Sequence, residues 1–152
     1  MRAARLILAG LLAGVLVTPA QAADADKAIK YRQALFQVIL WDFGPMAGMV
    51  KGKIPFDAAA FAARAERVSM MGSRIVEGFG PGTDAGDMKT RALPAIWEDR
   101  AGFEKAAQDF IDASAKLASV AKGGDEDAMK AQFAATGKTC KGCHDEYRAK
   151  KK

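Results

Sequence analysis

Two cysteines and the only histidine of the chain lie together in one short motif, Cys140-Lys141-Gly142-Cys143-His144. Thiols with this C-x-x-C-H spacing add to the two vinyl groups of a haem, and the histidine that follows supplies an axial nitrogen to the iron. On a helix, residues three and four positions apart share a face, so all three side chains can reach one flat ligand. The motif therefore predicts one covalently bound haem c, attached at Cys140 and Cys143 and ligated by His144.

Other uses of this motif fit the sequence less well. A structural zinc site needs four ligands, usually cysteine or histidine, and His144 is the single histidine. A thiol-disulfide exchange motif belongs near a βαβ pattern, which the sequence does not show. A structural disulfide is common in exported proteins, but a bond between Cys140 and Cys143 would close almost no loop.

The position of the motif limits where a sixth iron ligand could come from. Only eight residues follow His144, and none of them is methionine or histidine. A sixth ligand would therefore have to come from an upstream helix that faces the haem. Methionines could be unorthodox ligands, although core or interface packing is their more ordinary role. The candidates are Met46, Met49, Met70 and Met71.

The N-terminal residues have the pattern of an export signal. Two arginines precede an apolar run over residues 6–17, and Ala20-Gln21-Ala22 matches the small-x-small cleavage pattern. The run is shorter than the ~20 apolar residues that a membrane-spanning helix needs. We therefore predict a signal peptide over residues 1–22, a mature domain over residues 23–152, and a bacterial periplasmic protein without membrane insertion.

The size and charge of the mature chain exclude some functions. About 130 residues are enough for one domain with a core but too few for two. The full chain has 23 basic and 18 acidic residues, which become 21 and 18 without Arg2 and Arg5. This formal +3 is too weak to indicate nucleic-acid binding. Basic residues near the C-terminus form either a solvated helix end or a docking patch for an acidic redox partner. They are Lys138, Lys141, Arg148, Lys150, Lys151 and Lys152.

The composition is typical of an all-α protein, because helix-forming residues dominate and no stretch alternates with the period of a strand. A first helix is expected over about residues 24–50, with Pro45 as a kink or an early end. This helix is apolar on more than one face. We interpret the excess as a dimer contact, the alternative being that the cofactor alone covers it. The apolar residues are Ile29, Leu35, Phe36, Val38, Ile39, Leu40, Trp41, Phe43 and Met46.

A second helix and a long connection are expected next. Asp57 is a suitable N-cap, and Phe56 and Phe61 occupy the positions of a hydrophobic staple. The apolar face of this helix continues up to Gly78. The glycine-rich stretch 78–87 then favours a long crossover rather than a tight turn.

Two more helices complete the predicted fold. The third begins near Asp99 and ends at Gly123-Gly124, and the fourth begins at Asp125-Glu126-Asp127, where the helix dipole favours acidic residues. Four amphipathic helices with one long crossover, between helices 2 and 3, predict an antiparallel four-helix bundle.

The mature chain resembles the cytochrome c′ family, the class II c-type cytochromes, over essentially its whole length. The resemblance rests on five groups of residues in this order. They are Lys30-Tyr31-Arg32-Gln33, Val50-Lys51-Gly52-Lys53, Phe79-Gly80-Pro81-Gly82-Thr83, Ile96-Trp97, and Cys140 to Asp145 with Tyr147-Arg148. The stretch Met88–Pro94 departs from the family pattern by its greater length.

The resemblance implies a left-twisted bundle, usually a homodimer joined through helices 1 and 2, with a five-coordinate, high-spin haem between the helices. Arg32 matches a family arginine near a haem propionate, and Gln33 and Asp87 match positions that contact the haem edge. Arg148 matches an arginine on the proximal side of the haem, where it would disfavour the oxidised state and restrict access.

The resemblance also implies a role for Phe36, which lies four residues after Arg32. In low-spin relatives a methionine at this position binds the iron, whereas phenylalanine cannot. The distal side is therefore expected to be apolar and vacant. Bound dioxygen requires a distal hydrogen-bond donor, whereas NO and CO bind well in an apolar pocket.

Three functions remain open at this point. The first is NO or CO binding, and the second is electron transfer with an unidentified redox partner. The alternative for the second is a low-spin electron carrier with an unorthodox methionine ligand. The third, peroxidase-like catalysis, is disfavoured because no distal histidine and arginine pair could help to break an O–O bond, so we predict that the protein is not an enzyme.

Overall fold

The computed structural model describes residues 19–150, with side chains from residue 24 onward. Within that range there is no strand, and one β-bridge pairs Ala92 with Arg148. The elements are α1 (Pro19–Val50), α2 (Ala58–Gly72), the short 3₁₀ helix η1 (Glu77–Phe79), α3 (Ala95–Glu98), α4 (Arg100–Lys122) and α5 (Glu126–Tyr147).

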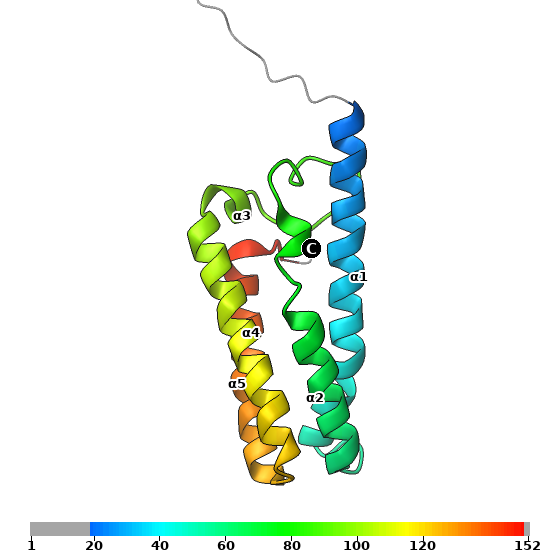
Figure 1. Ribbon diagram of the computed structural model, residues 1–152, viewed down its shortest axis with the longest axis vertical. Coiled ribbons are helices and arrows are strands. Elements are labelled where there is room, and N and C mark those ends of the chain that lie inside the picture. Colours follow the sequence, from blue (N-terminus) through cyan, green and yellow to red (C-terminus); the bar gives the residue numbers. More distant parts are fainter. Residues whose placement is uncertain (1–18, 151–152) are drawn as a thin grey trace, which may run out of the picture.

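The four long helices form an antiparallel bundle (Figure 1). α1 packs against α2, α2 against α4, and α4 against α5, and successive long helices run in opposite directions. Residues 80–94, which we call the crossover, join η1 to α3 at the end of the molecule where α5 finishes (Figure 1). The predicted four-helix bundle with a long crossover between its second and third long helices is confirmed.

Local capping explains where the helices begin and end. The carboxylates of Asp57, Asp99 and Asp125 accept backbone N–H bonds in the first turns of α2, α4 and α5, at 2.9, 3.1 and 3.0 Å. Gly52 follows α1 with a left-handed φ of 66°, and the N–H of the next residue donates to the carbonyl of Gly48 at 2.9 Å. The predicted helix starts at these three aspartates are therefore confirmed.

Of the two roles predicted for Pro45, the early end is wrong, because α1 runs through Pro45 to the predicted end near residue 50. It continues to Val50, and Met46 and Met49 are buried on its last turns, where they hold this segment against the core. Most of the predicted signal peptide lies outside the described residues, and cleavage after Ala22 stays a prediction. None of the helices within residues 19–150 combines the length and the apolarity needed to cross a membrane.

α2 is shorter than predicted, since it ends at Gly72 rather than Gly78. Beyond Gly72 the chain tightens into hydrogen bonds that span three residues, as far as Phe79. Gly72 lies so close to Phe110 that an added Cβ would be 3.0 Å from that ring. Phe110 lies ten residues into α4, a rise of ~15 Å. α2 therefore stops well short of the start of α4, and the crossover occupies that end of the bundle.

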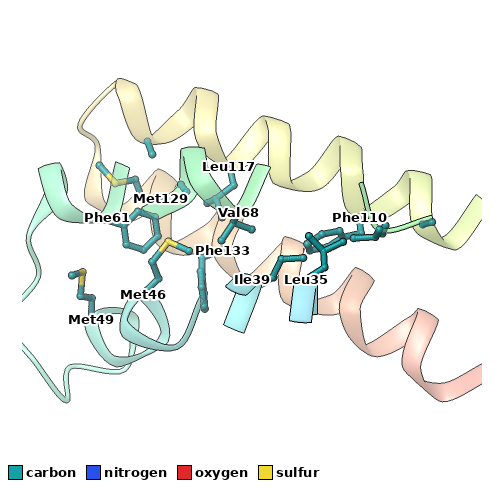
Figure 2. Close-up of a cluster of buried hydrophobic side chains, with 14 residues drawn as sticks. Leu35, Ile39, Met46, Met49, Phe61, Val68, Phe110, Leu117, Met129 and Phe133 are labelled. Carbon is teal, nitrogen blue, oxygen red and sulfur yellow. The ribbon is translucent and has the colours of Figure 1, made fainter. Parts of the chain in front are cut away.

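The core consists of two groups of buried side chains. The main cluster lies between the four long helices, and Figure 2 shows Phe61, Phe133 and Met46 close together within it. Phe56 stacks on Phe61 with 5.3 Å between ring centroids, which confirms the predicted staple. The main cluster is Leu35, Ile39, Met46, Met49, Phe61, Ala65, Val68, Ile75, Ala107, Phe110, Leu117, Ala121, Met129 and Phe133. The second cluster, beside the crossover, is Phe79, Ile96, Phe103 and Tyr147.

Candidate haem site

The predicted haem-attachment motif lies on the last turns of α5. Both cysteines are free and half-buried, and His144 is half-buried as well. Cys140 packs against the main cluster, whereas Cys143 packs against the second cluster. The motif therefore lies at the boundary between the two parts of the core.

Burial shifts the pKa values of all three side chains of the motif. Burial raises the pKa of the Cys140 thiol to about 11 and also raises the pKa of Cys143, so both thiols are neutral near pH 7. The pKa of His144 is lowered by burial and then by the positive charges of Arg148 and Arg91. The neutral imidazole is therefore favoured near pH 7, and one of its two nitrogens has a lone pair available for a metal.

One aromatic contact gives the register between α1 and α5. The rings of Phe43 and Phe133 stack with their centroids 4.3 Å apart. The two helices are antiparallel, so going back along α1 from Phe43 and forward along α5 from Phe133 leads toward the same end of the bundle. Seven residues on each helix cover a rise of ~10 Å. This step leads to Phe36 on α1 and to Cys140 on α5. Phe36 packs against both clusters, so it lies at the same boundary as the motif.

Arg32, one turn before Phe36, is 2% exposed and holds the crossover in place. One guanidinium nitrogen donates to the carbonyl oxygens of Gly78 and Thr83, each at 3.0 Å, and the other donates to the hydroxyl of Thr90 at 3.3 Å. The guanidinium carbon is 4.8 Å from the centroid of the Phe79 ring. The structure thus places a buried cation close to the boundary between the clusters. The register that pairs Phe36 with the motif also brings Arg32 level with His144.

Gln33 and Asp87, the other two residues that the family resemblance assigns to the haem edge, differ in their surroundings. Gln33 is exposed, and its amide donates to the carbonyl of Lys89 in the crossover at 2.8 Å. Asp87 is an exposed residue of the crossover. Gln33 therefore borders the site through the crossover, whereas Asp87 lies at the surface.

Arg148 directly follows α5 and is exposed. Its backbone pairs with Ala92. Its positive charge partly opposes the rise that burial causes in the pKa values of Cys140 and Cys143, and it adds to the lowering of the pKa of His144 by burial. The structure thus brings this arginine to the motif.

Sequence reasoning missed the contacts that hold the residues just after His144. Arg91 Nε donates to the carbonyl of Ala149 at 2.8 Å, and Leu93 N–H donates to the carbonyl of Tyr147 at 3.1 Å. The hydroxyl of Tyr147 donates to Asp99 at 2.8 Å. No periodic pattern could have predicted these contacts, because they join an irregular segment to residues about fifty positions away in the sequence.

The donor set suits a flat macrocycle better than a bare metal ion. Among the described residues, no group of three or more histidine, cysteine or acidic side chains is arranged to hold an ion. The two neutral thiols instead lie along one helix, with an aromatic side chain across from them and a buried cation nearby. A haem needs these groups, since it is apolar over its ring and anionic at its propionates.

Comparisons with known proteins agree with this arrangement. A family model described as Cytochrome C' matches residues 27–148. A cytochrome c' from Rubrivivax gelatinosus is 46% identical over 123 residues, which are 81% of this chain and 95% of the relative. The structure of a cytochrome c prime from Shewanella frigidimarina has a TM-score of 0.79 at 48% identity, covering 83% of this chain and 97% of that one. A nitric oxide complex of a mutant cytochrome c prime from Alcaligenes xylosoxidans has a TM-score of 0.77 at 39% identity, covering 84% and 97%.

Proposed function

Because this chain belongs to the cytochrome c′ family, whose members carry covalently attached haem c, we propose that Cys140 and Cys143 hold the haem and that His144 is its only protein ligand to iron. The register between α1 and α5 carries this proposal, because it sets Phe36 across from the motif. Phenylalanine has no lone pair to offer a metal. The haem is then five-coordinate and high-spin, with a vacant distal side.

Arg32, Gln33 and Asp87 belong to the haem edge in this proposal. The support is strongest for Arg32, whose buried guanidinium lies level with His144 and could offset the charge of a propionate. Gln33 contributes indirectly, because its hydrogen bond to the carbonyl of Lys89 holds the crossover against α1. Asp87 is exposed, so its contribution is limited to the rim of the site.

An apolar distal side selects among small gases. Dioxygen bound to iron gains negative charge and needs a hydrogen-bond donor, whereas NO and CO do not. Phe36 offers no such donor, and a mutant of a relative from Alcaligenes xylosoxidans has a solved structure as a nitric oxide complex. We therefore infer that this protein binds NO and CO reversibly and is not an enzyme.

Optical spectra of the purified holoprotein test the proposal. The ferric and ferrous forms should both be high-spin, and the ferrous form should change its spectrum with NO and with CO. In air it should oxidise without forming a durable oxygenated species. A low-spin spectrum before any gas is added, or a stable oxygen complex, would overturn the vacant apolar site.

Electron transfer is the second candidate function. The exposed basic residues around the motif, Lys138, Lys141 and Lys150, could dock an acidic redox partner. A low-spin carrier with a methionine ligand is less well supported. By the same register Met46 lies level with residue 130 of α5, ten residues and thus ~15 Å short of Cys140. The spectra described above also distinguish this alternative.

The homodimer proposal is supported by an apolar seam on α1 that the other described residues, 24–150, leave exposed. Tyr31, Val38 and Trp41 are 38%, 47% and 78% exposed and recur at helical spacing, and Met70 of α2 is 55% exposed. We expect this seam to pair with a second copy of the chain. Val38→Glu should shift sedimentation of the holoprotein toward the monomer, whereas Gln37→Glu, which adds the same charge one position away, should not.

Export to the periplasm is proposed from the N-terminal sequence. Mass spectrometry of the protein isolated from its native host should find Ala23 as the first residue. A mature chain that retains residues 1–22 would contradict the predicted signal peptide.

A further inference from the structure

The crossover connects the two helices that border the proposed haem site. On the α1 side, Gln33 donates to the carbonyl of Lys89, and Arg32 donates to the hydroxyl of Thr90. On the α5 side, the next residue, Arg91, binds Ala149 through its guanidinium. Residues 89–91 therefore link the distal and the proximal walls of the site directly.

Arg91 is held by both its side chain and its backbone. Its guanidinium donates two hydrogen bonds to the carbonyl oxygen of Ala149, one of them at 2.8 Å from Nε. Its own carbonyl accepts the N–H of Ala149 at 2.8 Å. These bonds fix the chain that follows α5 only five residues after His144, and they fix the position of the guanidinium as well.

The charge of Arg91 is not offset by a neighbouring carboxylate within ion-pair distance among residues 24–150. Its guanidinium lies against the carbonyl of Ala149, and the backbone of the next residue, Ala92, pairs with Arg148, so Arg91 lies beside the segment that follows the helix of His144. Arg91 is also partly buried, whereas Arg148 is exposed. A partly buried charge is screened by solvent and salt less than an exposed one.

We propose that Arg91 is a positioning residue of the haem site, which fixes the chain after the axial histidine and places a second cation on the proximal side, so that the ferrous state is favoured. This inference rests on the proposed haem attachment at the motif. When ferric haem accepts one electron, the charge of the site falls by one, so a nearby positive charge stabilises the product more than the reactant.

Two variants separate the charge of Arg91 from its hydrogen bonds. Arg91→Gln removes the charge and keeps a donor for the carbonyl of Ala149, whereas Arg91→Lys keeps the charge and loses the two-pronged contact. Lys105→Gln removes one charge from an exposed site on α4 and serves as the control. The midpoint potential of each holoprotein is measured by spectroelectrochemistry, and amide hydrogen exchange is followed at Leu93.

The potential should fall in Arg91→Gln, stay near the wild-type value in Arg91→Lys, and remain unchanged in Lys105→Gln. Exchange at Leu93 should become faster in Arg91→Lys. An unchanged potential in Arg91→Gln, or an equal fall in Lys105→Gln, would overturn the proposal. The wild-type spectrum tests haem coordination separately. If the holoprotein is high-spin but its midpoint potential does not change in Arg91→Gln, the inference about Arg91 is wrong and the proposed haem site still stands.

Discussion

The two ends of the bundle are stabilised in different ways. Around the main cluster, side chains from all four long helices pack against one another, as in the contact of Phe43 with Phe133. At the crossover end α2 is absent, and much of the order comes from hydrogen bonds to backbone oxygens, with Arg32 at their centre. The first arrangement depends on shape and apolar area, whereas the second adds a few directional contacts to the smaller second cluster.

This difference suggests a division of roles. Apolar packing supplies most of the folding free energy, because each large buried side chain contributes a few kcal/mol. Directional contacts to an irregular segment instead fix the position of groups around a ligand. We therefore expect substitutions in the main cluster to change stability without altering the haem, and substitutions at the crossover end to affect the haem first.

The largest stability loss is expected from Phe61→Ala. Phe61 is fully buried in the main cluster, and its truncation leaves a cavity that should reduce the free energy of unfolding by about 3–5 kcal/mol. Denaturant unfolding of the holoprotein measures the loss. The spectrum of the folded variant should match the wild type, and a change in spin state would show that the two ends are not separable.

A smaller loss is expected from Arg32→Met. The substitution leaves the carbonyls of Gly78 and Thr83 without their buried donor, which should cost about 2–3 kcal/mol. Hydrogen exchange should accelerate in the crossover while α4 keeps its protection. Arg100→Met is the matched control, because Arg100 also binds a carbonyl next to the crossover but is 38% exposed. An equal effect in both variants would contradict the central role of Arg32.

The sequence predicted the long helices and their caps better than the irregular segments that join them. Asp57, Asp99 and Asp125 cap helices as expected, because a cap depends on residues only three positions away. The motif was recognisable for the same reason, since its geometry follows from helical spacing. The early end of α2 and the contact of Arg91 with Ala149 depend on packing between distant segments, which no local pattern encodes.

The ion pairs of Asp42 with α2 predict that the stability of the protein depends on pH. The buried carboxylate of Asp42 binds Arg67 and Arg64, and these partners hold its pKa below the usual range. Because the folded-state pKa is depressed, the stabilisation is present above the unfolded value of about 3.9 and is lost as the pH falls through the folded value.

Asp42→Asn should therefore destabilise the holoprotein at pH 7 by about 1 kcal/mol, since Arg67 is half exposed and solvent screens the pair. Unfolding free energies measured from pH 7 down to pH 3 should show wild type and variant converging in acid. A gap that stays constant would mean that the ionised carboxylate is not what stabilises the contact between α1 and α2.

The sharpest test of the comparison comes from replacing a phenylalanine by methionine at two positions of α1, where little stability is lost. Phe36→Met and Phe43→Met replace aromatic rings seven residues apart on the same face, and each should cost less than about 1.5 kcal/mol. Only the variant at Phe36 places a sulfur across from the motif.

Phe36→Met should convert the haem to a six-coordinate, low-spin state that binds CO weakly, because the methionine sulfur competes for the vacant side. Phe43→Met should keep the high-spin spectrum, since Phe43 contacts Phe133 one heptad away from Cys140. Optical and magnetic resonance spectra of both variants measure this. A high-spin spectrum in Phe36→Met would mean that this side chain does not face the iron, and a low-spin spectrum in Phe43→Met would place the iron one heptad further along the bundle than the register indicates.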